Sequence, residues 1–189
     1  MNRLFLSLLA VFFVAGCQTL EDVPLDRATI FYDRATFPEK LQQDTGTLDE
    51  PILQHGRCSL YLATPGATVT TNFRFCIYAL TEKHLLIQGW DAANTKYIPI
   101  MNVDLTKLTS VDLASFIRIK QVKLLEPQRQ TGISAIIDNG GYIDQEATEQ
   151  LFETIKARGI PSTGDSKLMR APPAPSSAPM MIPIVIPRR

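Results

Sequence analysis

The run FIRIKQVKL, residues 116–124, alternates apolar side chains with basic or polar ones. Because successive side chains of a β-strand point to opposite faces, this alternation predicts a strand with one buried face. Ile117 and Ile119 are expected on one face, and Arg118 and Lys120 on the other, with Lys123 further along the same run. Since they lie on an alternating strand, we interpret these three cations as a solvated face rather than as an anion-binding site.

Six further runs flank this one and are rich in β-branched and aromatic residues, which favour strands. Turn-forming residues, such as Pro65 and Gly66, separate them. The runs cover residues 58–63, 68–80, 83–90, 95–101, 107–114 and 133–137. Seven short strands at this spacing predict a small antiparallel β barrel or sandwich.

A helix is predicted after the last strand, at residues 145–158, with Asp144 in position to cap it. Gly159 suits the left-handed position that follows a helix, and Pro161 prevents its continuation. The apolar residues share one face of this helix: Ala147, Leu151, Phe152 and Ile155. That face must be buried, so the helix is expected to cap an open end or face of the strands. The predicted fold class is therefore α+β, mostly β, with one C-terminal helix.

The start of the chain carries the sequence LFLSLLAVFFVAGC at residues 4–17. Its apolar part has the length of a secretory signal and is shorter than the roughly 20 residues that cross a membrane. The last four residues, Val14-Ala15-Gly16-Cys17, resemble the bacterial lipobox, in which small residues precede a cysteine that is acylated through its sulfur. The resemblance implies a signal peptide at 1–16 and a lipoprotein carrying palmitate at Cys17. An ordinary signal peptide and a plain apolar helix are the alternatives.

The resemblance also implies a location. In lipoproteins the residue after the acylated cysteine influences sorting, and here Gln18 stands where Asp would indicate retention in the inner membrane. We therefore expect a lipid anchor in the cell outer membrane, with the protein facing the periplasm. The 19 basic and 19 acidic residues balance, which gives no reason to expect nucleic acid as a partner.

Export leaves two cysteines besides the acylated one, Cys58 and Cys76, in a compartment that permits disulfides. A bridge between them is predicted to close a loop of roughly 18 residues and to contribute about 3 kcal/mol in the chain-entropy model. Two buried thiols are the alternative. The chain has no Cys-x-x-Cys motif, and its two histidines, His55 and His84, are far apart in sequence. No metal or cofactor is therefore expected.

Composition suggests four regions: a signal peptide at 1–16, a lipid-anchored tether at 17–57, a β domain with its helix at 58–160, and a Pro-rich tail at 161–189. The tether is assigned because its first part is acidic and its second part is turn-rich. The tail ends in the apolar sequence MMIPIVIP at 180–187. That end is interpreted as a disordered tail, an added edge strand or a peptide that docks on a partner.

The body of the chain resembles a pleckstrin-homology-like domain of the bacterial type. The resemblance is carried by LTEKHLLI at 80–87, YIPI at 97–100 leading to LTKLTSV at 105–111, and the helix at 145–158. Such domains are usually binding modules, which implies binding here too. The sequence lacks the basic phosphate-binding cluster of the members that bind phosphoinositides.

These features predict a non-catalytic, lipid-anchored envelope protein that binds or assembles with another envelope protein. Ser59 and Ser110 are candidate nucleophiles, but neither lies in a recognisable nucleophile motif, so no catalytic residue is assigned. A carrier of lipid or of a small hydrophobic ligand, using the interior of the β assembly, is the first alternative. An envelope hydrolase is the second, and it would need His84 gathered with an acid and a hydroxyl.

Overall fold

The structure is a computed structural model that describes residues 30–46 and 50–172. The predicted signal peptide, the lipidation at Cys17 and the apolar end at 180–187 lie outside these residues and stay predictions. No described helix is long and apolar enough to cross a membrane.

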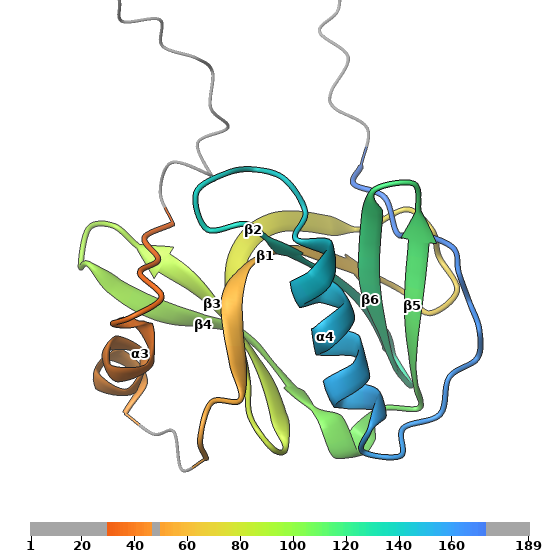
Figure 1. Ribbon diagram of the computed structural model, residues 1–189, viewed down its shortest axis with the longest axis horizontal. Helices are drawn as coiled ribbons and strands as arrows, with labels where there is room; N and C mark the ends of the chain where they lie inside the picture. The colour runs from red at the N-terminus through yellow and green to blue at the C-terminus, as the bar shows by residue number, and fades with distance from the viewer. Residues whose placement is uncertain (1–29, 47–49, 173–189) are drawn as a thin grey trace, which may run out of the picture.

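Seven antiparallel strands form one strongly curved sheet, with a helix at its C-terminal end (Figure 1). The strands lie in the order β4-β3-β2-β1-β7-β6-β5, so the first strand is central. Their bounds are β1 (Gln54–Ala63), β2 (Asn72–Leu80), β3 (His84–Asp91), β4 (Lys96–Asp104), β5 (Ser110–Phe116), β6 (Ile119–Glu126) and β7 (Arg129–Ile136), with a 3-10 turn, η1 (Leu105–Lys107), between β4 and β5. The predicted fold class is confirmed.

The helix α4 (Gln145–Lys156) follows the prediction closely. The Asp144 carboxylate accepts a hydrogen bond of 2.9 Å from the backbone N–H of Ala147, and Gly159 has the left-handed φ of +82°. The apolar face of α4 packs onto β5, β6 and β7 and closes the core. The fully buried core side chains include Leu60, Tyr78, Leu124, Ile133, Leu151 and Ile155.

The strand predicted at 116–124 begins three residues later than expected, because a turn lies inside the run. β5 ends at Phe116, a turn of two residues follows, and β6 begins at Ile119, which pairs with Phe116. Ile117 in this turn has a φ of +54°, which side-chain periodicity does not reveal. The prediction of a solvated basic face is wrong for Lys123, which is buried and forms an ion pair with Asp165.

The domain begins earlier than the predicted boundary at residue 58. The helix α3 (Phe37–Thr45) places Phe37 and Leu41 one turn apart, and both are fully buried. They pack with Ile77 and Tyr97 against the outer face of β2 and β4, forming a second, smaller core. Residues 30–46 and 50–57 are therefore part of the fold and not a tether. The polar residues of this N-terminal segment lie on its exposed side, which explains why its composition is polar.

Aromatic contacts tie this segment to β1. The Tyr32 hydroxyl lies 3.0 Å from Nδ1 of His55, and the Phe37 ring stacks on the imidazole at 5.1 Å. Burial lowers the pKa of His55 and raises the pKa of Tyr32 to about 12. Both side chains are thus held neutral at neutral pH.

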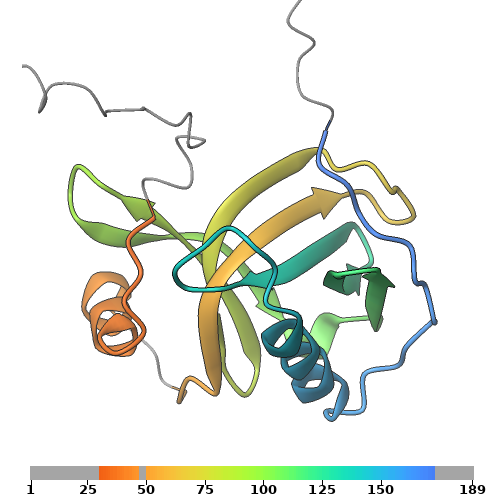
Figure 2. The same ribbon diagram turned by 45° about the horizontal axis from the view of Figure 1, so that its top comes forward.

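The domain also extends past the predicted boundary at residue 160. Residues 161–170 run along the outer side of β5, β6 and β7 (Figure 2). The Gln121 side chain accepts a bond of 2.8 Å from the N–H of Met169, and Arg170 forms a parallel bridge with Val69. The first part of the predicted tail is therefore a strap that covers polar side chains of the sheet, while residues 173–189 lie outside the described range.

Candidate functional site

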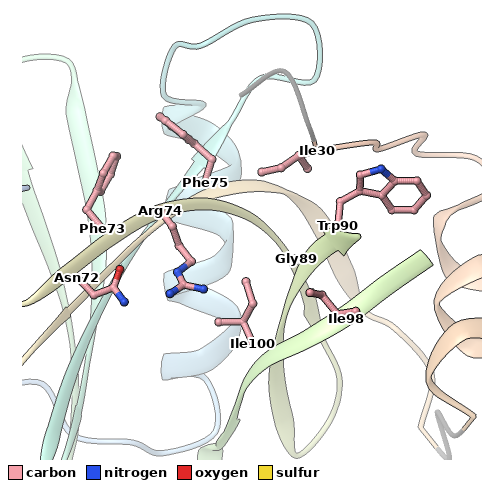
Figure 3. Close-up of a pocket in the computed structure, with 9 residues that line it drawn as sticks. All are labelled: Ile30, Asn72, Phe73, Arg74, Phe75, Gly89, Trp90, Ile98 and Ile100. Carbon is pink, nitrogen blue, oxygen red and sulfur yellow. The ribbon is translucent and has the colours of Figure 1, made fainter. Parts of the chain in front are cut away.

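A groove opens where β2 and β3 diverge (Figure 3). β2 pairs with β1 along its whole length, but its pairing with β3 covers only Ile77–Leu80. The register between β3 and β4 shifts at Ile87/Gln88, and β3 then continues beside β4 to Asp91. Such an irregularity bends a strand away from its neighbour. The first half of β2 and the second half of β3 therefore stand apart.

The groove has a volume of about 350 Å³ and is open to solvent. Ile98 and Ile100 from β4 and Trp90 from β3 form one wall, and the first residues of β2 form the other. A Cβ atom at Gly89 would lie 3.2 Å from Cδ1 of Ile100. Glycine at this position thus allows the isoleucine side chains to lie across β3.

The aromatic residues at the groove are held by other rings. Trp90 lies 5.1 Å from both Phe31 and Tyr97, measured between ring centroids, and the Lys40 ammonium lies 5.4 Å from the Trp90 ring. On the β2 side, Phe73 packs edge-on against Phe75 at 5.2 Å. Rings fixed in this way can bind an apolar group without losing much conformational freedom.

Arg74 is the unusual residue of the groove. It shares a face of β2 with Cys76, Tyr78 and Leu80, all of which belong to the core. Figure 3 shows its side chain pointing toward Ile100, with Phe73 and Phe75 on the opposite side of the strand. It is half-buried, and within the described residues its guanidinium forms no ion pair or hydrogen bond. An unpaired cation among apolar side chains favours an anionic ligand.

The groove can thus bind a group that combines apolar surface with a carboxylate or phosphate. Asn72 adds an amide beside Arg74. The residues that line the groove include no acid, histidine, cysteine or hydroxyl side chain.

The predicted disulfide residues are brought together in the core. Cys58 and Cys76 are directly opposite in the β1–β2 register, both are buried, and their Sγ atoms are 2.9 Å apart. A disulfide bond is about 2.05 Å long, so the structure holds two thiols in contact rather than a bond. Burial raises the pKa of Cys58 well above its usual value. The disulfide bridge stays a prediction. The contact between the two Sγ atoms shows that the side chains are already close to each other.

Thiol titration tests the bridge and the acylation together. Full-length protein extracted from membranes and denatured is expected to show no reactive thiol before reduction and two after it, because Cys17 is blocked and the other pair is bridged. Two thiols before reduction would contradict the bridge. A further thiol that appears in either state would contradict acylation of Cys17.

His84, the residue on which the hydrolase alternative depends, is the first residue of β3, directly after the β2–β3 turn. An acid and a hydroxyl are nearby, but the Thr81 hydroxyl donates to the backbone carbonyl of His84 and accepts from its N–H. Glu50 Oε2 accepts from the N–H of Lys83 and is 3.8 Å from the imidazole Nδ1. These contacts stabilise a turn, and the imidazole makes no hydrogen bond to the hydroxyl. Ser59 and Ser110 are buried in strands.

Within residues 30–46 and 50–172, no cluster of three or more His, Cys, Asp or Glu residues is placed to hold a metal ion. The barrel interior is filled by the core side chains described above, and the groove lies at the surface. A carrier of lipid would therefore have to use the groove rather than the interior proposed from the sequence.

No family model and no curated protein sequence matches this chain. Among solved structures, the chain is similar to a structure from work on the PH and C1 domains of the Vav1 exchange factor. The TM-score is 0.41, and the identity is 16% over 64% of this chain and 32% of the Vav1 chain. It is also similar to the hSac2 domain of the human phosphoinositide phosphatase Sac2, with a TM-score of 0.37 and 11% identity over 78% of this chain and 95% of that one. The chain thus spans about a third of the Vav1 structure.

Proposed function

We propose that the protein is a non-catalytic binding module, anchored by lipid at Cys17 to the outer membrane and facing the periplasm, which recognises another envelope protein through the β2–β3 groove. Arg74, whose guanidinium has no ion pair or hydrogen bond within the described residues, lies among apolar and aromatic side chains, and this observation carries the proposal. As part of the same proposal, the domain is a pleckstrin-like barrel with a C-terminal helix. Domains of this type usually bind rather than catalyse.

The groove suggests the kind of segment that is bound. A carboxylate, from an acidic side chain or a chain terminus, would pair with Arg74, and apolar side chains beside it would contact Ile98, Ile100 and Trp90. A charged hydrogen bond in a partly desolvated site contributes about 1.5–3 kcal/mol. Loss of Arg74 should therefore weaken binding by roughly 10- to 100-fold, since each 1.4 kcal/mol is tenfold.

Crosslinking in cells tests the proposal. A photoreactive side chain at Phe73 is expected to give a discrete crosslinked protein product, which is at least about tenfold weaker when Arg74→Ala is added. Arg74→Lys should restore part of it because the charge returns without the planar fork. Arg170→Ala, which removes an equal charge from an exposed position, should leave it unchanged.

A product that is insensitive to Arg74→Ala would contradict recognition through the groove. If native mass spectrometry instead finds an anionic lipid that is lost in the Arg74→Ala protein, the carrier function replaces protein binding.

A further inference from the structure

An apolar tip protrudes from one end of the barrel, where the β5–β6 turn lies near the loop that follows β7. We define it as Phe116, Ile117, Ile119 and Tyr142. The exposed fractions of Phe116, Ile117 and Tyr142 are 60%, 82% and 79%. Phe116 and Ile119 are opposite each other in the β5–β6 register, and Ile119 and Tyr142 line one shallow groove of about 420 Å³. The four side chains therefore form one surface.

The backbone at the tip argues against a purely structural role. Ile117 has a φ of +54° in a turn of two residues, a conformation that Gly, Asn or Asp adopts at lower cost than a β-branched residue. Its side chain is almost fully exposed, so packing does not compensate for this strain. Strain of this kind at an exposed side chain points to a role in binding.

The tip lies at the same end of the molecule as the first and last described segments. In Figure 1 the β5–β6 turn, the loop between β7 and α4, the segment that leads into α3 and the end of the strap all lie in the upper half of the molecule. Cys17 precedes Ile30 by about 13 residues, which span at most about 45 Å. A surface that holds Cys17 is therefore within reach of this end.

The charge and size of the tip fit a lipid surface better than a protein one. Arg118, between the apolar residues, is exposed and forms no ion pair within the described part of the chain. Lys120 is paired with Glu149. A two-residue turn offers far less than the roughly 800 Å² per partner of a stable protein interface. Aliphatic side chains with an aromatic ring and a cation are instead typical of residues at the boundary between lipid headgroups and acyl chains.

We propose that the tip inserts into the lipid surface beside the anchor and so fixes the orientation of the domain. Phe116 and Ile117 enter the acyl boundary, Tyr142 lies at the headgroup level, and Arg118 pairs with a lipid phosphate. The choice of surface rests on the proposed anchor at Cys17, but the insertion does not require acylation.

Flotation with vesicles separates insertion of the tip from acylation of Cys17. The mature chain, residues 17–189, lacks the apolar signal and carries Cys17→Ser so that it cannot be acylated; it is mixed with vesicles of phosphatidylethanolamine and phosphatidylglycerol. It is expected to bind them, and Ile117→Asn combined with Phe116→Ser should lower the partition coefficient at least tenfold. Asn tolerates positive φ, so Ile117→Asn alone should melt no lower than its parent while binding less. Val69→Asn, at another exposed apolar position, is the matched control and should bind as the parent does.

A parent protein that does not float, or an Ile117→Asn protein that binds as the parent does, would overturn the inference. Neither result bears on acylation, which the thiol count reports independently.

Discussion

Replacing Phe37 by alanine is expected to lower the free energy of unfolding by about 3–5 kcal/mol, the range for removing a buried aromatic ring. The ring is fully buried and contacts Tyr32, His55 and Tyr97 at centroid distances of 5.1–5.5 Å. Its loss leaves a cavity between α3 and the outer face of the sheet. The effect would establish that the N-terminal segment is part of the cooperative unit.

Urea denaturation followed by circular dichroism measures this change. Gln42→Ala, at an exposed position of the same helix, is the control and should change stability by less than about 0.5 kcal/mol. A change in the Phe37→Ala protein as small as that of the control would mean that residues 30–46 do not stabilise the domain.

Asp112→Ala is expected to cost about 3 kcal/mol, because it removes one charged acceptor from several donors at once. The carboxylate accepts bonds of 2.7–2.8 Å from the Ser162 hydroxyl, the Thr163 N–H and hydroxyl, and the Gly164 N–H. These donors begin the strap along β5–β7. We expect protease to cut the strap faster in the variant, while Glu153→Ala, at an exposed acid, leaves cleavage unchanged.

The same carboxylate predicts a dependence on pH. Burial by itself would raise the pKa of Asp112, but the hydrogen bonds from Ser162, Thr163 and Gly164 outweigh it and hold the pKa below its usual value. The stability it provides is therefore present above the unfolded pKa of about 3.9 and is lost as the pH falls through the folded value. The difference in stability between wild type and Asp112→Ala should shrink below about pH 4. A difference that stays constant down to pH 2 would contradict this role.

The sequence predicted the elements that have a clear local period. The helix after Asp144 and the number of strands followed from spacing alone, because the apolar face of each element is buried against one core. The turn at Ile117 was missed because its left-handed backbone carries no glycine or asparagine. The covering segments were missed because α3 buries only Phe37 and Leu41 and otherwise reads as polar.

The groove could not be predicted, because it depends on where β2 stops pairing with β3. That point is set by the irregularity at Ile87/Gln88, which involves residues of two strands. One local signal was present: Arg74 occupies the position that alternation assigns to the core, two residues before Cys76. A charged residue at an inward position of a strand marks either a buried ion pair or a site.

The central place of β1 in the sheet has a consequence for the timing of folding. Ser59 in β1 pairs with Ser134 in β7, and Val69 pairs with Arg170. The first strand synthesised can therefore pair on both sides only after the last parts of the chain have been made. Such distant contacts slow folding, because a long loop must close before they stabilise the chain. A nascent chain that cannot close its sheet remains unfolded, and this delay would suit the export that we propose for this protein.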